Sequence, residues 1–262
     1  QSDVELVVPD EGKRRDFARL RNLMLLYFTN GWYQQCIRLG NELTMDNEKD
    51  RFAWYYKSLA YSAFKQNQDA ITALKSLVAI DPSLKYAHVS LGNLFLQDSK
   101  YQDALQAFQK VLHLDAHSVP ALLGLGNAWL EMGIKDKAVQ ALEQAIVADP
   151  ENTAARIQLA RILAEEQGML NVALAHAQKA RESAPNNPEA MDALGWAYVQ
   201  KGNIDKALPE LEAAAKQLSL DPVVMYHLGA AHALNNDHER AHGALHKALQ
   251  LSKDFPGAKE AT

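Results

Sequence analysis

Apolar residues recur three and four positions apart through most of the chain, the spacing that places side chains on one face of an α-helix. Short turns interrupt this pattern about every thirteen residues, so it predicts a series of short amphipathic helices. The turns are marked by Gly31, Gly133, Gly168 and Gly202, or by polar clusters at residues 97–100 and 235–237. Strand-like alternation is absent, so the chain is predicted to be all-α.

The helical pattern returns after thirty-four residues. Leu91-Gly92 recurs as Leu125-Gly126. Further matched pairs are Phe95 and Trp129, Ala104 and Ala138, Phe108 and Leu142, and Val111 and Ala145. A fixed period of this length in apolar helical sequence is typical of a stacked helical array.

The period divides nearly the whole chain into seven units, 17–50, 51–84, 85–118, 119–152, 153–187, 188–221 and 222–255. Residues 1–16 form a polar lead-in, and residues 256–262 form a tail that we expect to be truncated. The first unit departs from the pattern, because Met24 stands where glycine is usual and Gly40 where a large apolar residue is usual. The fifth unit carries one extra residue near Gly168.

This spacing resembles the tetratricopeptide repeat family over residues 17–255. The resemblance implies a right-handed superhelix of antiparallel helix pairs, in which small residues such as Gly92 and Ala104 let the two helices approach closely. It also implies that the first helices line a concave groove, which in this family usually binds a peptide or a partner protein. Fold alone does not name that partner.

In this family the second, fifth, ninth and twelfth residues of each unit tend to face the groove. The resemblance therefore predicts a groove with an aromatic end, a polar centre and one further aromatic residue: Phe52, Tyr55 and Tyr86, then Asn93, Asn127 and Arg161, then Trp196.

The polar residues of this predicted groove have two interpretations. Asparagine is disfavoured inside helices, so Asn93 and Asn127 in equivalent positions suggest a role. Their amides would either bind a ligand's peptide backbone or hydrogen-bond the neighbouring helix and stabilise the stack. Arg161 is a candidate partner for a ligand carboxylate. Trp196 either faces the groove or covers a neighbouring helix.

Charge and composition exclude several classes of protein. The formal net charge of −5 gives no electrostatic reason to expect binding to nucleic acid or to an anionic membrane. No apolar run reaches the roughly twenty residues that span a bilayer, so we expect no membrane insertion. Cys36 is the single cysteine, which excludes an intrachain disulfide. A cytoplasmic location is expected, or a periplasmic one if a signal peptide was removed.

One stretch matches a catalytic motif. His238-Glu239-Arg240-Ala241-His242 reads H-E-x-x-H, in which two histidines bind zinc and the glutamate acts as a base. However, Ala241 occupies the small packing position of the repeat, and no catalytic domain accompanies the motif. We expect no resident metal and no cofactor. At most, His238, His242 and His246 would bind a metal adventitiously from one helix face.

The sequence therefore predicts a non-enzymatic adaptor or scaffold that binds a peptide or partner protein. The asparagines follow Val89 and Leu123 rather than lysine, so the groove does not resemble repeats that capture chaperone C-termini. Two alternatives stay open. One is a substrate-docking or regulatory segment of a larger enzyme, such as a protein glycosyltransferase or phosphatase. The other is a self-assembling scaffold or a chaperone for secretion or envelope assembly. Leu245 and Leu249 are expected to be exposed in the last unit, which would favour homo-oligomers through the C-terminal repeat or a longer chain.

Overall fold

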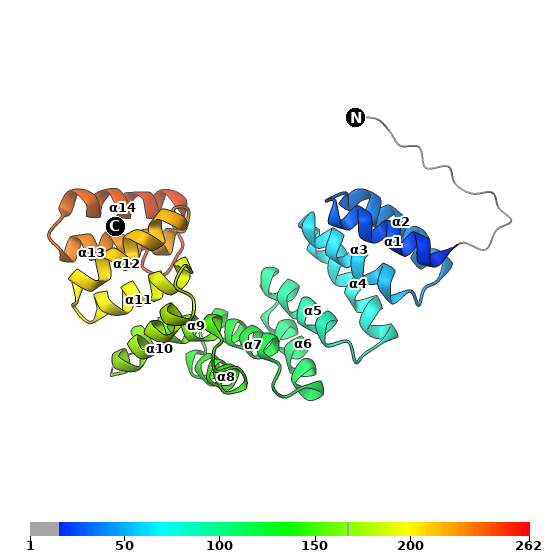
Figure 1. The fold of residues 1–262 in the computed structure, drawn as a ribbon, viewed down its shortest axis with the longest axis horizontal. Coiled ribbons are helices and arrows are strands. Elements are labelled where there is room, and N and C mark those ends of the chain that lie inside the picture. Colours follow the sequence, from blue (N-terminus) through cyan, green and yellow to red (C-terminus); the bar gives the residue numbers. More distant parts are fainter. Residues whose placement is uncertain (1–15, 167) are drawn as a thin grey trace, which may run out of the picture. The chain divides into compact units, whose positions relative to one another are not determined.

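The computed structural model describes residues 16–166 and 168–262, and over these residues it is entirely helical, without strands (Figure 1). The helices are α1 (Phe17–Thr29), α2 (Tyr33–Asp46), α3 (Arg51–Ala63), α4 (Asn67–Ile80), α5 (Lys85–Gln97), α6 (Tyr101–Leu114), α7 (Val119–Glu131), α8 (Lys135–Ala148), α9 (Thr153–Ala164), α10 (Leu170–Ser183), α11 (Pro188–Gln200), α12 (Ile204–Gln217), α13 (Pro222–Leu234) and α14 (His238–Leu251). The predicted all-α class is confirmed. The predicted lead-in lies outside the described residues except for Asp16, whose carboxylate accepts a hydrogen bond from the Arg19 N–H at 3.1 Å and caps α1.

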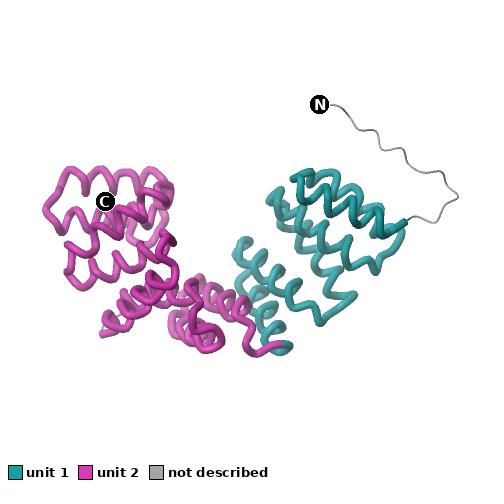
Figure 2. The backbone as a smooth tube through the Cα atoms, viewed as in Figure 1, with its two compact units in different colours: residues 1–114 teal, residues 115–262 magenta. Residues whose placement is uncertain are grey.

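The helices form seven consecutive pairs. Each odd-numbered helix packs against the even-numbered helix that follows it, and the short turn between them makes the two antiparallel neighbours. We call the odd-numbered helices the first helices and the even-numbered ones the second helices. The chain divides into two compact units, residues 1–114 with α1–α6 and residues 115–262 with α7–α14 (Figure 2). Each unit is described by itself below.

Six of the turns inside the pairs share one backbone geometry, and the turn between α9 and α10 differs, with the Met169 N–H bonded to the Glu166 carbonyl at 3.2 Å. In α7, the N–H of Gly133 bonds to the Leu130 carbonyl at 2.8 Å, and the N–H of Ile134 bonds to the Trp129 carbonyl at 2.8 Å. This is the Schellman arrangement, which requires a left-handed residue just after the helix. The left-handed residue of the turn is glycine in four pairs and another residue in three: Gly31, Gly133, Gly168 and Gly202, and Lys65, Ser99 and Asn236.

A large apolar side chain of one helix packs into the space over a glycine of its partner helix. In unit 1, Phe108 of α6 is fully buried against Gly92 of α5, where an added Cβ would lie 2.5 Å from the Phe108 ring. In unit 2, Gly195 of α11 receives Leu211 of α12 in the same way. This contact explains why the glycine and the large apolar residue recur together in the sequence.

The first pair reverses this contact. Met24 of α1 stands at the glycine position and is fully buried, and Gly40 of α2 stands at the position of the large residue. A Cβ on Gly40 would lie 2.7 Å from the Met24 methyl group, so the methionine fills the space that the glycine leaves. The two departures from the repeat pattern therefore compensate each other.

The segment after α14 turns back onto α13. Phe255 packs against a buried cluster that includes Met191 and Met225, and its ring centroid lies 6.1 Å from that of Tyr226. Gly257 contacts the Tyr226 ring, and Ala261 is buried. Leu245, expected to be exposed on the far side, is half-buried, because it packs against Gly229 as the large residues of other pairs pack against their glycines. Leu249 is half-buried.

Gly257 offers a test of this terminal contact. Its φ of +96° is in the left-handed region, and an added Cβ would lie 2.3 Å from Tyr226 Cε1. Gly257→Ala is therefore expected to lower the free energy of unfolding by about 1–3 kcal/mol. The matched control is Gly243→Ala on α14, where nothing lies within 4 Å of the added Cβ. That change is expected to stabilise by about 0.5–1 kcal/mol. Urea denaturation followed by circular dichroism measures both, and equal shifts in the same direction would contradict the terminal contact.

Candidate functional site

The three aromatic residues predicted to line a groove lie on the first helices of unit 1, where the Phe52 ring packs against Tyr56, with centroids 4.4 Å apart, and against the buried cluster around Met24. Phe52 and Tyr55 belong to α3, and Tyr86 belongs to α5. The Tyr55 and Tyr86 rings meet edge to face, with centroids 4.9 Å apart and an interplanar angle of 75°. Tyr86 is 45% exposed, while Phe52 and Tyr55 are half-buried. We call these three side chains the aromatic face.

The polar atoms on this face are unpaired. Within residues 16–166 and 168–262, no hydrogen bond is found to the hydroxyl of Tyr55 or Tyr86, or to the side-chain amide of Asn93. Asn93 is exposed on α5. Burial raises the pKa of Tyr86, and the neighbouring Tyr55 adds to this rise, so the Tyr86 phenol stays protonated at neutral pH. The aromatic face and Asn93 thus offer apolar rings and polar groups that can both donate and accept hydrogen bonds.

Asn127 lies on α7 in unit 2 and is half-buried. In the described part of the chain its amide also has no hydrogen-bond partner. The interpretation in which Asn93 and Asn127 stabilise the stack requires a bond to a neighbouring helix, and neither amide makes one there. Contact of the two amides with a ligand stays a prediction.

Arg161 is already paired with a carboxylate of its own unit. Its Nη2 donates to Asp192 Oδ2 at 3.0 Å, and Asp192 Oδ1 lies 2.8 Å from His227 Nδ1. The Asp192 side chain is fully buried on α11, and it links α9 on one side with α13 on the other. We call Arg161, Asp192 and His227 the Asp192 cluster. Because the Arg161 side chain is still 37% exposed, its contact with a ligand stays a prediction.

The two partners determine the charge state of Asp192. Burial by itself raises the pKa of this carboxyl group, since a charge is poorly solvated inside the protein. The charge of His227 and its hydrogen bond to Asp192, together with those of Arg161, outweigh the burial. The pKa of Asp192 therefore lies below its ordinary value, and the carboxylate is ionised at neutral pH.

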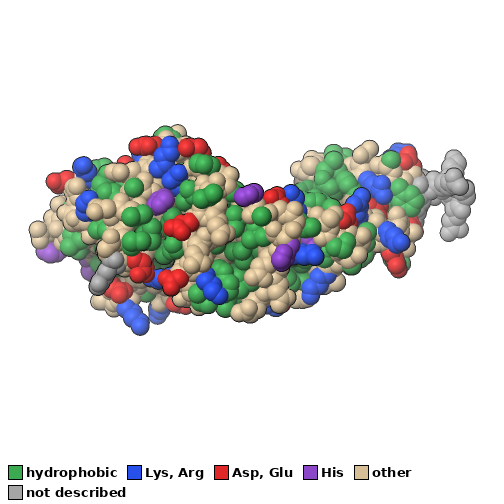
Figure 3. Space-filling model, turned by 90° about the horizontal axis from the view of Figure 1, so that it is seen from below, with side chains coloured by type: hydrophobic (Ala, Val, Ile, Leu, Met, Phe, Trp, Pro, Cys, Tyr) green, Lys and Arg blue, Asp and Glu red, His purple; other side chains and the backbone are tan. Residues whose placement is uncertain are grey.

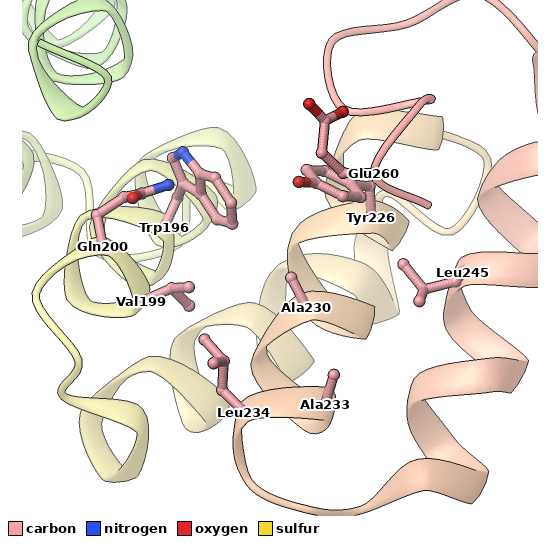
Figure 4. A pocket seen from close by; sticks show the side chains of 9 residues that line it. All are labelled: Trp196, Val199, Gln200, Tyr226, Ala230, Ala233, Leu234, Leu245 and Glu260. Carbon is pink, nitrogen blue, oxygen red and sulfur yellow. The ribbon is translucent and has the colours of Figure 1, made fainter. Parts of the chain in front are cut away.

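Trp196 mainly covers a neighbouring helix. It is 9% exposed, and its ring stacks on His227 with centroids 4.1 Å apart and an interplanar angle of 14°. Trp196 and Tyr226, whose ring centroids lie 5.7 Å apart, line an open pocket of about 370 Å³ together with Glu260 (Figure 4). Burial raises the pKa of Tyr226, and the charges of Glu260 and Glu165 raise it further. This pocket was not predicted, because Glu260 belongs to the segment that turns back after α14.

The catalytic motif of α14 does not assemble a metal site. His242 and His246 stack with centroids 5.9 Å apart, and Gln250 Nε2 donates to His246 Nε2 at 2.8 Å. Among the residues that the structure describes, no group of three or more histidine, cysteine, aspartate or glutamate side chains is placed to hold a metal ion. Burial raises the pKa of Cys36 to about 11, so this thiol is not activated as a nucleophile.

The sequence reasoning missed Asp192 and His227 as functional neighbours of Arg161. The sequence did hold a signal: an arginine stands at a groove position of one repeat, and an aspartate stands at a groove position of the next repeat. The same type of contact occurs in unit 1, where Arg21 Nε donates to Asp50 Oδ2 at 3.0 Å. Arginine followed by an acidic residue about one repeat later is therefore a sign of an ion pair between repeats.

The surface agrees with the modest net charge. On the face shown in Figure 3, basic and acidic side chains are interspersed with apolar and polar ones over both units. Across the described ranges, none of the helices combines the length and the apolar character needed to cross a membrane.

Tandem pairs of short antiparallel helices, packed through small residues on one helix and large ones on the next, define a helical-repeat protein. Models of the tetratricopeptide repeat family match residues 95–145 in one case, and residues 123–188 and 193–259 in the other. These matches cover more than half of the chain, which belongs to the tetratricopeptide repeat family. Proteins of this family generally act as interaction scaffolds and are typically not catalytic. No curated protein matches the sequence.

Solved structures share the fold at low identity. The APC/C hetero-tetramer Cut9–Hcn1 matches with a TM-score of 0.74 and 16% identity, over 96% of this chain and 49% of that one. The chain thus spans about half the length of that protein. Pseudomonas aeruginosa pilF matches with a TM-score of 0.66 and 18% identity, over 82% of this chain and 98% of that one. YrrB, described as a TPR protein with an unusual peptide-binding site, matches with a TM-score of 0.53 and 22% identity, over 71% and 95%.

Proposed function

We propose that this chain is a non-catalytic scaffold that binds an extended peptide or protein segment along its first helices. The observation that carries the proposal is the combination of apolar rings with unpaired polar groups on these helices. In unit 1 these are the aromatic face and Asn93, and in unit 2 the corresponding amide is Asn127. Amides that have no partner in the protein offer a donor and an acceptor to a ligand's backbone.

The aromatic face and the amides would have different tasks. Aromatic anchors usually supply most of the binding energy, because they bury large apolar areas. The amides would add bonds that do not depend on the ligand's side chains. Arg161 would contribute only through the exposed part of its guanidinium group, since Asp192 already holds one side of it. Self-association through the C-terminal repeat stays a separate and narrower proposal.

A photocrosslinking amino acid placed at residue 93 or 127 tests the proposal. Matched positions on the second helices are Gln109 of α6 and Gln140 of α8, which are both exposed. We expect ligand segments to be captured from residue 93 in unit 1 and from residue 127 in unit 2, and not from 109 or 140. Mass spectrometry of the crosslinked products identifies the segments. Capture from the second-helix positions alone would show that the ligand binds another face.

Affinity measurements with the captured segment then separate the roles. Asn127→Ala is expected to weaken binding about fivefold, the effect of losing one hydrogen bond of about 1 kcal/mol. Tyr55→Ala is expected to change which segments are preferred, because it removes part of the anchor. Unchanged affinities in both variants, with the helical signal intact, would assign the asparagine and the tyrosine a role outside binding.

A further inference from the structure

The open pocket beside Trp196 in unit 2 has an apolar floor. Ala230 of α13 stands at the groove position that Arg161 and Trp196 occupy in the two preceding repeats, and its small side chain leaves space there. Val199 of α11 and Leu234 of α13 line the same space, and Leu234 is 59% exposed. The pocket therefore offers apolar surface that a hydrocarbon chain of a ligand would cover.

The single charged group among the described residues that line this pocket is the carboxylate of Glu260. The segment after α14 brings it there, because Phe255 packs into the core of unit 2 and Gly257 lies against the Tyr226 ring (Figure 4). Glu260 is exposed, and within the described ranges no hydrogen bond or ion pair to its carboxylate is found. Lys259, its neighbour in the sequence, does not line the pocket. The fold thus holds an unpaired acid at the edge of apolar surface.

The electrostatic field in the pocket is negative. Burial raises the pKa of Tyr226 most, and the charges of Glu260 and Glu165 raise it further. The cations nearby in the sequence pattern have partners of their own, since Lys135 pairs with Glu165 at 3.1 Å and Arg161 is held by a buried aspartate. The negative charge of Glu260 is therefore left for a ligand to compensate.

A basic side chain matches both the floor and the charge. A purely apolar side chain would remove water from Glu260 and give nothing in return, which is costly. Arginine and lysine instead join a hydrocarbon stem to a cationic head. The stem would cover Val199 and Leu234, and the head would pair with Glu260. Because the centroids of Trp196 and Tyr226 are 5.7 Å apart, one cation can lie within about 6 Å of both, the range of cation–π attraction.

We propose that the pocket lined by Trp196, Tyr226 and Glu260 binds an arginine or lysine side chain of a partner segment. The inference rests on the proposed function, because the pocket lies on the first helices α11 and α13, and it adds the chemistry of one ligand residue. The rings are already fixed for this task, since Trp196 stacks on His227 and Tyr226 is held by Gly257.

The test compares two small probes that differ in charge. Nα-acetyl-arginine amide carries a guanidinium group, and Nα-acetyl-citrulline amide has the same shape with a neutral urea group in its place. Each probe is titrated into the full chain labelled with fluorotryptophan, and the fluorine NMR signal of Trp196 reports occupancy of the pocket. Probes of this size are expected to bind in the millimolar range. We expect the citrulline probe to bind about fivefold more weakly than the arginine probe.

Two substitutions in one segment locate the charge. Glu260→Gln keeps the size of the side chain and is expected to weaken binding of the arginine probe about three- to tenfold, to the affinity of the citrulline probe. Asp254→Asn removes an exposed carboxylate that does not line the pocket, and it is expected to change the affinity by less than about twofold. Neither carboxylate makes a hydrogen bond or ion pair in the described protein, so both variants should keep their helical signal.

The outcomes separate this inference from the proposed function. Equal affinity of the two probes, or no shift of the Trp196 signal with either, overturns the inference. So does an unchanged affinity for the arginine probe in Glu260→Gln. If crosslinks from residues 93 and 127 still capture ligand segments in these cases, the proposed function stands and the pocket does not select a basic residue. If the arginine probe binds as expected and those positions capture nothing, the choice of a cation stands and the proposed course of the ligand along the first helices falls.

Discussion

Asp192→Ala is expected to lower the free energy of unfolding of unit 2 by about 3 kcal/mol. The change leaves Arg161 and His227 without the carboxylate that they share. Removing one partner of a buried ion pair usually costs about 3–5 kcal/mol, and the lower end applies because Arg161 is 37% exposed. Urea denaturation followed by circular dichroism measures the loss. Glu189→Ala, which removes an exposed carboxylate from the same helix, is the matched control and is expected to change stability by less than about 0.5 kcal/mol.

The same variant predicts how the contribution of Asp192 depends on pH. Its pKa in the folded protein lies below the ordinary value, so folding favours the ionised carboxyl group. This stabilisation is fully present above the unfolded pKa of about 4, and it is lost as the pH falls through the lower folded value. The stability difference between wild type and Asp192→Ala should therefore be complete at about pH 5 and shrink below about pH 4. A difference that is unchanged by acid would mean that the carboxylate is held by packing rather than by charge.

Phe108→Ala is expected to destabilise unit 1 by about 3–5 kcal/mol. Phe108 is fully buried, and its ring fills the space over Gly92, so truncation leaves a cavity between α5 and α6. The midpoint of urea denaturation reports the loss. Phe64→Ala removes the same atoms from a ring that is 47% exposed, and it is expected to cost less than about 1 kcal/mol.

A double-mutant cycle tests whether the ring and the glycine act as one contact. Gly92→Ala alone places a Cβ 2.5 Å from the Phe108 ring and should destabilise by overpacking. In the background of Phe108→Ala the same methyl group enters the cavity. The double variant is therefore expected to be more stable than the sum of the single losses predicts. Strict additivity would show that Gly92 is not needed for the approach of the two helices.

The fold was predictable because one packing contact recurs at a fixed spacing. Each repeat of glycine and large apolar residue marks a helix pair, and the left-handed turns follow at Gly133 and Gly202 or at their polar equivalents. The class of fold and the family are confirmed. The first repeat, residues 17–50, could be assigned only by its spacing from the later repeats, because Met24 and Gly40 each break the pattern. Only their contact in space shows that the two departures compensate each other.

The candidate site was predictable only in part. The resemblance to the repeat family implied that Tyr55 and Tyr86 face the same side of the first helices, and their rings do meet. The partner of Arg161 could not be found in this way. Whether Arg161 reaches Asp192 or faces a ligand depends on how neighbouring repeats are displaced relative to each other, which the sequence pattern does not give. The orientation of Trp196, toward the groove or over a neighbouring helix, was undecided for the same reason. Its ring stacks on His227 and is mostly buried.

The reversed contact of Met24 and Gly40 limits which helices could be exchanged between repeats by recombination. A second helix that carries a large residue, such as Leu74 in α4, cannot pair with α1, because two bulky side chains would meet where only one fits. Conversely, α2 joined to a first helix with glycine would leave an unfilled gap. Productive crossover points are therefore expected in the loops that separate pairs, such as residues 47–50, and not in the turns inside them. We therefore expect such arrays to exchange whole helix pairs, and the separate helices of the first pair to be the least exchangeable.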